Sequence, residues 1–253
     1  MNFSEDHQMI HIGICGANGK MGKRLISLLE SQTLPELVLS AGFIPRQSPL
    51  KGKRLNDQLR YQPLSQDTIK DIDVLVDFSV PQAASDYMPL LRKLRKPAVI
   101  GTTGFTVEQK QAIQQLSQVV PIVAAPNMSI GVNVLLRLIS KAAEWLPQDF
   151  KPFISEIHHI HKKDAPSGTA AQLEAEIKSA QKHTEIPIES IRAADVVGEH
   201  TVVFYGMGER LELTHRALSR DIFAKGALQA AHWVLHKKPG IYSMQHVLQG
   251  GHR

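Results

Sequence analysis

A glycine-rich turn near the start of the chain constrains its fold most strongly. It follows an apolar run, residues 9–15, and opens a stretch in which Met21, Leu25 and Leu28 recur at helical spacing. The turn reads Gly16-Ala17-Asn18-Gly19-Lys20-Met21-Gly22. Glycines allow close approach to a phosphate, and the N–H groups of a helix start bind anions. This arrangement predicts dinucleotide binding, with a merely structural tight turn as the alternative.

Apolar runs and helical stretches alternate through the first half of the chain. We expect strands at residues 9–15, 37–43, 74–78, 98–100 and 121–125. Helices are expected directly after the glycine-rich turn, from Pro81 to about residue 94, and at residues 107–118. Alternating strands and helices predict an α/β fold with a parallel sheet covered on both faces.

The pattern changes near Asn127. Helices are expected at residues 130–145, 168–182 and 222–236, and a strand at residues 153–161. Residues 196–204 and 210–215 are expected to form antiparallel strands joined by a turn that contains Gly206 and Gly208. The second half therefore predicts an α+β layer. The boundary is placed at about residue 129, which gives domains 1–129 and 130–219.

Charge and cysteine content exclude several classes of protein. The chain has 253 residues, 29 Lys+Arg, 24 Asp+Glu and one Cys, so the formal net charge is +5. One Cys rules out a disulfide framework and a multi-cysteine metal site, and fits the reducing cytoplasm. No apolar run reaches the roughly 18 residues of a membrane span, and the polar residues 1–8 show no signal peptide. Neither a helix-turn-helix nor a dense basic face is present, so nucleic acid is not an expected partner.

The end of the second predicted strand bears on the choice of cofactor. An acid there usually binds the ribose 2′-hydroxyl of NAD, but none occurs between Glu36 and Asp57. Cations stand in this stretch instead, namely Arg46, Lys51, Lys53 and Arg54, and Lys20 lies in the turn. They favour a 2′-phosphate and hence NADPH as an accepted cofactor, unless they form an ordinary solvated loop.

Three later strand ends carry small or polar residues. Ligands bind at the carboxyl ends of strands in open α/β sheets. The segments are Asp77-Phe78-Ser79, Gly101-Thr102-Thr103-Gly104 and Ala125-Pro126-Asn127-Met128. Each alone would be a routine turn, but together they favour a pocket that admits a nicotinamide ring.

Residues 156–169 (EIHHIHKKDAPSGT) give the strongest local signal. On a strand, His159 and His161 would share one face and His158 would lie on the other. These histidines and Lys162 can donate protons. Ser167 is expected to cap the following helix, whose start, left accessible by Gly168, suits a carboxylate. The segment therefore predicts proton donors beside a carboxylate site.

Other chemistries remain as alternatives for this segment. His159 and His161 could bind a metal, although Glu156 would lie on the opposite face, and a solvated histidine-rich strand end is also possible. No metal is expected overall. A serine nucleophile has no G-x-S-x-G motif to support it. Cys15 is expected to be a small buried residue, which argues against a thiol-dependent aldehyde dehydrogenase.

Several motifs together resemble one enzyme family. They are GANGKMG, DFSVP, GTTGF, APNMSIGVNV, EIHHIHKKDAPSGTA and VGEHTVVF followed by GERLELTH. The chain resembles 4-hydroxy-tetrahydrodipicolinate reductase (dihydrodipicolinate reductase) from about Ile10 to Gln249. The resemblance implies a Rossmann-like N-terminal domain, an α+β C-terminal domain with a mixed or antiparallel sheet, and a segment 220–253 that returns to the first domain. It also implies a homotetramer, use of NADH and NADPH, and reduction of a cyclic dicarboxylate with loss of water in lysine and diaminopimelate synthesis.

The resemblance also implies residue roles. His158 would be the acid/base group and Lys162 the proton donor, while His159, Gly168 and Thr169 would contact the substrate. Residues 16–21 would hold the pyrophosphate, and residues 101–103 and 125–128 the nicotinamide side. Two departures stand out: Ile44 and Pro45 occupy the place where relatives carry an acid, and the segment 182–194 is shortened, which bears on oligomer contacts. The competing hypotheses are a nucleotide-sensing regulator and a metal-dependent hydrolase.

Overall fold

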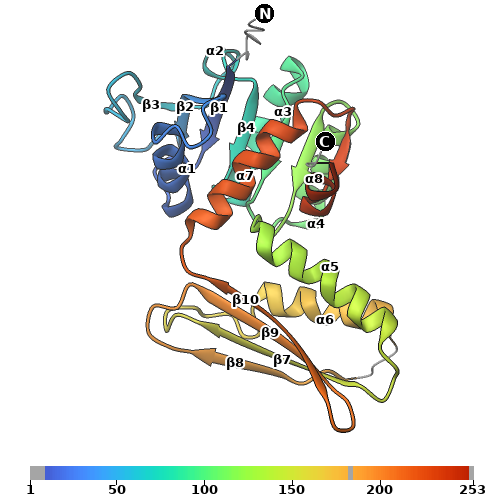
Figure 1. Ribbon diagram of the computed structural model, residues 1–253. Helices are drawn as coiled ribbons and strands as arrows, with labels where there is room; N and C mark the ends of the chain where they lie inside the picture. Colours follow the sequence, from blue (N-terminus) through green and yellow to red (C-terminus); the bar gives the residue numbers. More distant parts are fainter. Residues whose placement is uncertain (1–8, 182–184, 251–253) are drawn as a thin grey trace, which may run out of the picture. The chain divides into compact units, whose positions relative to one another are not determined.

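The computed structural model describes residues 9–181 and 185–250 (Figure 1). The predictions for residues 1–8, for 182–184 and for 251–253 lie outside the described residues. The chain divides into two compact units. Unit 1 comprises residues 1–128 and 223–253, and unit 2 comprises residues 129–222.

Unit 1 is built on a seven-stranded sheet with the order β11-β6-β5-β4-β1-β2-β3. Every pairing in it is parallel. The strands are β1 (Ile10–Cys15), β2 (Leu37–Ile44), β3 (Tyr61–Pro63), β4 (Val74–Asp77), β5 (Ala98–Ile100), β6 (Pro121–Ala124) and β11 (Gly240–Tyr242). The order β3-β2-β1-β4-β5-β6 is that of the Rossmann fold, so the predicted α/β class is confirmed.

Helices cover both faces of this sheet and bury its alternate residues. The helices are α1 (Lys20–Glu30), α2 (Gln66–Ile69), α3 (Pro81–Leu94), α4 (Val107–Ser117), α7 (Asp221–Val234) and α8 (Met244–Gly250). Ile12 and Ile14 of β1 pack in a core with α1, α7 and α8. Leu75 of β4 packs in a second core with α3 and α4. Because both faces are covered, the central strands β1, β4 and β5 consist mostly of apolar residues.

Unit 2 contains a four-stranded mixed sheet with the order β10-β9-β7-β8. Its elements are α5 (Ile130–Trp145), β7 (Lys151–His158), α6 (Gly168–Ala180), β8 (Ile188–Arg192), β9 (Gly198–Tyr205) and β10 (Arg210–Ala217). Strands β7 and β8 are parallel, and the other pairs are antiparallel. Ile154 of β7 packs in one core with residues of α5 and α6. Alternate residues of β7 are buried, among them Glu156 and His158.

The predicted strand 153–161 is too long, because β7 ends at His158. The carbonyl of His158 accepts from Ala193 N, and Lys162 N donates to His159 O at 3.0 Å, so the chain turns there. The prediction that His159 and His161 share one face of a strand is therefore wrong.

Several short elements were not expected from the sequence. Strands β3 and β11 have three residues each, too few to show an alternating pattern, and they exist through pairing with β2 and β6. Strand β8 lies within residues 182–194, a segment for which no strand was expected. Helices α2 and α8 were also missed. Within residues 9–181 and 185–250, no helix has both the length and the apolar character needed to cross a bilayer.

Candidate active site

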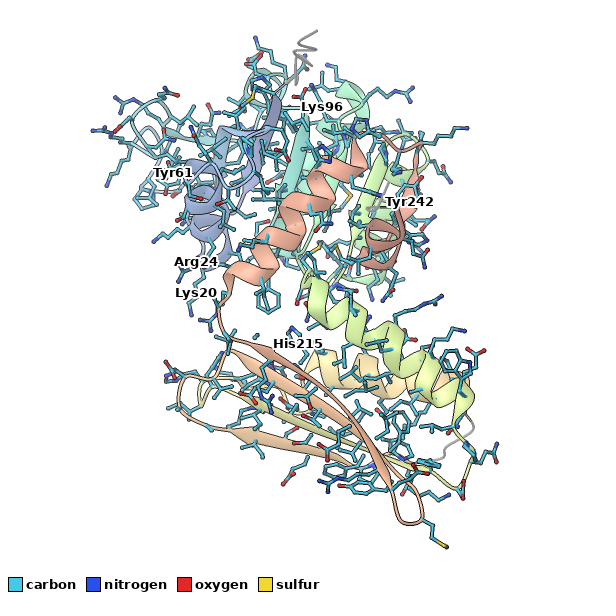
Figure 2. All side chains as sticks on the ribbon, in the orientation of Figure 1. Lys20, Arg24, Tyr61, Lys96, His215 and Tyr242 are labelled. Carbon is cyan, nitrogen blue, oxygen red and sulfur yellow. The ribbon has the colours of Figure 1, made fainter. Side chains whose placement is uncertain are left out.

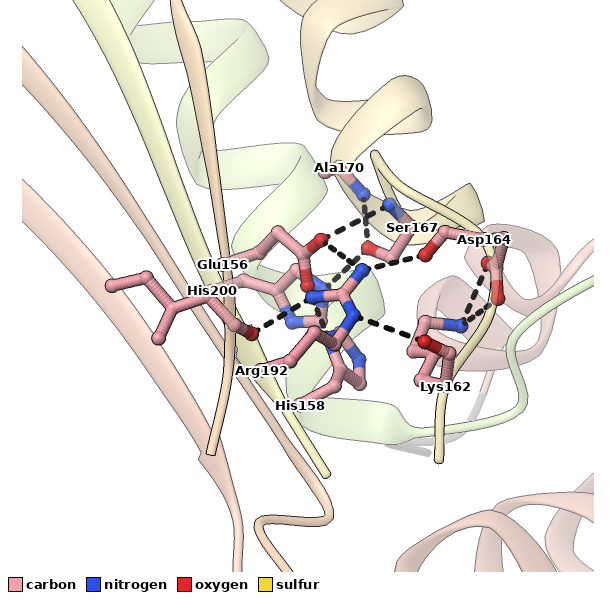
Figure 3. A network of polar contacts seen from close by, with 9 residues as sticks. Glu156, His158, Lys162, Asp164, Ser167, Ala170, Arg192 and His200 are labelled. Carbon is pink, nitrogen blue, oxygen red and sulfur yellow. Dashed lines mark hydrogen bonds and ion pairs between the residues drawn. The ribbon is translucent and has the colours of Figure 1, made fainter. Parts of the chain in front are cut away.

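The end of β7 carries a buried carboxylate that binds three groups (Figure 3). Glu156 is 0% exposed and pairs with Nδ1 of His158. Its Oε1 also accepts from Arg192 Nη2 at 2.9 Å and from the backbone N–H of Ser167 at 3.3 Å. Burial alone raises the pKa of Glu156, but hydrogen bonds from Arg192, Ser190 and His158 outweigh it, and the pKa is lowered. Glu156 is therefore a carboxylate at neutral pH.

His158 is positioned by this carboxylate and by strand β9. The residue is 8% exposed, and its Nε2 would lie 2.9 Å from a Cβ placed on Gly198. Burial lowers the pKa of His158, Glu156 opposes this shift, and the charges of Lys162 and Arg192 add to it. The imidazole is therefore neutral near pH 7 and can take up a proton that Glu156 would stabilise.

Lys162 lies on the loop that follows β7. Its Nζ donates to both carboxylate oxygens of Asp164, at 2.8 and 2.7 Å. The hydrogen bond from Lys162 lowers the pKa of Asp164, so this side chain is a carboxylate at neutral pH. The rings of His159 and His161 on the same loop lie with their centroids 6.2 Å apart. The loop thus places the Lys162 side chain where its charge acts on the buried imidazole of His158.

Helix α6 begins directly after this loop, and Ser167 caps it as predicted. Ser167 Oγ accepts from Ala170 N at 3.1 Å and contacts His200 Nε2 at 3.1 Å. A Cβ added to Gly168 would meet no atom within 4 Å, so the helix start is open on that side. Thr169, the next residue, is half-buried. An open helix start suits an anionic ligand.

His200 of β9 adds a second buried imidazole to the cluster. Burial, together with the neighbouring His158, lowers the pKa of His200 to about 4. Ligand atoms of Glu156, His158 and His200 lie within 4.8 Å of one another. The Arg192 guanidinium already neutralises the carboxylate of this set, so a cation would meet a positive charge there. The arrangement favours acid–base chemistry over metal binding.

The glycine-rich turn in unit 1 has the conformation that only glycine supports at low cost. Gly16 has a φ of +79°, and a Cβ there would lie 2.5 Å from the carbonyl oxygen of Phe78. A Cβ on Gly22 would overlap the carbonyl of Gly16, so this glycine allows α1 to pack closely. No side chain caps α1 at Gly19. The first-turn amides are therefore oriented toward the space where a phosphate would bind.

A pocket of about 390 Å³ lies beside this turn, within unit 1. Gly16, Asn18, Gly19 and Arg46 line it, whereas the side chain of Ala17 is buried and Met21 packs on the core. Lys20 lies at the start of α1 and is exposed (Figure 2). The second strand ends without an acid, and Arg46 follows it into the pocket, which fits a phosphorylated ribose.

A second pocket, of about 480 Å³, lies at the ends of β5 and β6. Thr102, Thr103, Ala125 and Pro126 line it. Gly101, Asn127 and Met128 do not, and Met128 is buried in the core. The predicted nicotinamide-side residues are thus divided: four line this pocket, Met128 lies in the interior, and Gly101 and Asn127 are half-buried outside the pocket lining.

Buried Asp77 connects the ends of β4 and β5. It accepts from Tyr87 Oη at 2.9 Å and from Ser79 N at 3.0 Å, and Ser79 N also donates to Thr102 Oγ1 at 2.9 Å. Burial raises the pKa of Asp77, although these hydrogen bonds lower it. Cys15 is buried as predicted, and burial with the nearby Asp77 raises its pKa to about 12. The thiol is therefore not a nucleophile at neutral pH.

Sequence reasoning missed Arg192, His200 and Gly198, although all three lie in this cluster. Arg192 stands 36 residues beyond Glu156 and becomes its neighbour through the parallel pairing of β7 with β8. His200 pairs opposite Glu156 in the antiparallel ladder of β7 and β9. The motif VGEHTVVF contains Gly198 and His200, but neither was assigned a role there, and no local pattern indicated Arg192.

Comparisons with known proteins identify the family of this chain. The family model "Dihydrodipicolinate reductase, N-terminus" matches residues 10–128, and the model "Dihydrodipicolinate reductase, C-terminus" matches residues 131–248. The chain belongs to the dihydrodipicolinate reductase family. The 4-hydroxy-tetrahydrodipicolinate reductase of Syntrophotalea carbinolica is 39% identical to it over 266 residues, covering 95% of this chain and 99% of the relative. The predicted family resemblance is confirmed.

Two further members of the family match over nearly their full length. The reductase of Syntrophus aciditrophicus is 40% identical over 267 residues, covering 95% of this chain and 98% of the relative. The structure of dipicolinate-bound dihydrodipicolinate reductase from Paenisporosarcina sp. TG-14 aligns with a TM-score of 0.80 and 26% identity. The alignment covers 94% of this chain and 99% of that one.

Proposed function

We propose that this dihydrodipicolinate reductase reduces 4-hydroxy-tetrahydrodipicolinate to tetrahydrodipicolinate in lysine and diaminopimelate synthesis. Each turnover consumes the substrate, NAD(P)H and one proton, and yields tetrahydrodipicolinate, NAD(P)⁺ and water. The observation that carries the proposal is the cluster of Glu156, His158 and Lys162 beside the open start of α6. It supplies the proton and the anion site that a dicarboxylate reduction requires.

Each of the site residues in unit 2 has its own role in binding or protonating the substrate. Lys162 donates the proton that accompanies hydride addition, and His158 is the acid/base group. The amides of Gly168 and Thr169 bind a substrate carboxylate, and His159 contacts the ring. A relative of this chain binds dipicolinate, a flat cyclic dicarboxylate, which supports this substrate class. When the carboxylate binds, it competes with Asp164 for the Lys162 ammonium.

Unit 1 has the features of a nicotinamide cofactor site. Glycines at positions 16 and 22 leave space that a Cβ would fill, which fits a bound pyrophosphate. The cofactor supplies the hydride. The turn residues 16–21 hold its phosphates, Arg46 binds a 2′-phosphate when NADPH is used, and residues 101–103 and 125–128 border the nicotinamide side. NADH is accepted as well.

The family and the composition support a proposal for the cellular location and the oligomeric state. We place the enzyme in the cytoplasm, where its single Cys would stay reduced. We also propose a homotetramer. The outer face of the unit 2 sheet supports this, because it exposes Tyr205 and Ile191 to 45 and 37%.

The decisive experiment supplies the product of the coupled upstream synthase with NADPH or NADH and follows cofactor oxidation. His158→Gln and Lys162→Ala should each lower kcat severely while NADPH still binds, because both lie outside unit 1. Near-wild-type turnover in either variant would contradict the assignment. Loss of activity on chelation, with no need for NAD(P)H, would instead support a metal-dependent hydrolase.

A further inference from the structure

Arg192, the last residue of β8, lies beside His158 in the parallel ladder. Its side chain is 19% exposed, and its guanidinium bonds in several directions at once (Figure 3). Nη2 donates to Glu156 Oε1 at 2.9 Å and to the carbonyl of Asp164 at 2.5 Å. Nε donates to the carbonyl of Lys162 at 3.3 Å, and Nη1 to that of Ile191 at 2.8 Å.

These bonds link two parts of the cluster. One is the Glu156 carboxylate, which holds the His158 ring. The other is the loop backbone at residues 162 and 164, which carries the Lys162 ammonium. A guanidinium presents five donors in a rigid plane, so one side chain can satisfy all of these acceptors. A lysine ammonium at the same place lacks that fork.

We infer that Arg192 is a positioning residue that fixes the Lys162 loop relative to the Glu156–His158 pair. Arg192 itself bonds to protein groups and acts on the reaction through Lys162 and His158. Its role in turnover rests on the proposed function. The simpler alternative is that Arg192 only anchors the edge strand β8, which would affect folding and not the geometry of the two proton-handling groups.

The kinetic test compares Arg192→Met, Arg192→Lys and the control Arg210→Met. Arg210 is also paired with a glutamate, Glu212, but it starts β10 at the opposite end of the sheet. We expect Arg192→Met to lower kcat roughly 10²-fold, as displacement of reacting groups by about 1 Å does. The KM for NADPH should not change, and Arg192→Lys should recover only part of kcat. Wild-type kcat in Arg192→Met, or full recovery by lysine, would overturn the inference.

Chemical rescue separates positioning from folding. Arg192→Ala leaves a space shaped for a guanidinium, so added guanidinium ion at concentrations well below those that denature should raise kcat, whereas methylammonium should not. A purely structural anchor predicts a lower melting temperature and no rescue by either ion. If Arg192→Ala is fully folded but guanidinium ion does not raise its kcat, the positioning role is contradicted.

The third readout does not depend on turnover. The charged or titratable groups around His158 are Glu156 on β7, Lys162 on the loop, Arg192 on β8 and His200 on β9. Removing the Arg192 charge should raise the pKa of His158 in Arg192→Met, measured by NMR on the histidine-labelled full chain and assigned with His158→Gln. If the wild type fails to oxidise cofactor but this shift occurs, the proposed function fails and the Arg192 role stands. An unchanged His158 titration would overturn the inference.

Discussion

The carboxylate of Glu156 holds Nδ1 of His158 from two residues earlier on the same strand, β7. Residues two apart on a strand share a face, so a single buried strand end places both groups side by side. The carboxylate selects the tautomer with the proton on Nδ1 and would stabilise the imidazolium. Arg192 and the backbone N–H of Ser167 donate to this carboxylate, and Gly198 lies against the His158 ring where a Cβ would not fit.

Glu156→Gln should impair turnover through His158. Glu156 raises the pKa of His158 by its hydrogen bond and its charge, so the amide should lower that pKa further. The limb of the kcat–pH profile that belongs to His158 should move to lower pH, and kcat should fall roughly 10²-fold. Glu189→Gln, at an exposed position on β8, is the control. An unshifted limb would show that Glu156 does not tune His158.

Gly198→Ala should displace the His158 ring without disturbing unit 1. The added Cβ would lie 2.9 Å from Nε2 of His158, closer than packed atoms allow. We expect a lower kcat with an unchanged dissociation constant for NADPH, measured by fluorescence titration. The same substitution in a His158→Gln background should have little further effect on kcat, because the effect acts through the ring. Additive losses would mean that Gly198 acts elsewhere.

Arg46→Ala should affect NADPH more than NADH. Arg46 lines the pocket beside the glycine-rich turn, and only NADPH carries the 2′-phosphate that this cation would bind. The KM for NADPH should rise more than the KM for NADH in steady-state assays. Arg92→Ala, an exposed arginine near the end of α3, serves as the control. Equal changes for both cofactors would rule out the 2′-phosphate role.

His200 should make the free energy of unfolding depend on pH. Its pKa is lowered from 6.5 to about 4 in the folded chain, so between these values the unfolded chain binds more protons. Stability should therefore fall by up to about 3 kcal/mol as the pH drops through this window. Urea denaturation at several pH values gives the free energy of unfolding as a function of pH. This free energy should change less with pH in His200→Gln than in His161→Gln, an exposed control. The same pH dependence of the free energy of unfolding in both variants would contradict a neutral buried His200.

Cys15 should resist alkylation in the native protein. Burial, with Asp77 nearby, raises its pKa to about 12, so the thiolate is scarce at pH 8. As it is the only cysteine, labelling by a thiol reagent reports on this site directly. We expect no labelling and no loss of activity before unfolding, and complete labelling in urea. Rapid labelling of the native protein would show that the thiol reagent reaches Cys15 at the end of β1.

Local sequence patterns determined much of this protein. The strand, glycine-rich turn and helix at residues 9–30 are encoded by apolar spacing and by glycines that no other residue can replace at low cost. Ser167 at the start of α6 was likewise predictable, because a helix cap is a local hydrogen bond. The histidines and lysines of the segment 156–169 suggested proton donors by their type and spacing, and their role in catalysis stays a prediction.

Only the tertiary structure decided which residues complete the candidate site. Strand β7 could not be ended correctly from the sequence, because the alternating pattern continues to His161 although the chain already turns where Lys162 N donates to His159 O. Arg192 and His200 reach Glu156 through the register of β8 and β9. Periodicity within a segment shows which face of a strand is buried. It carries no information on which distant residue the sheet will place opposite, since that depends on pairing between strands.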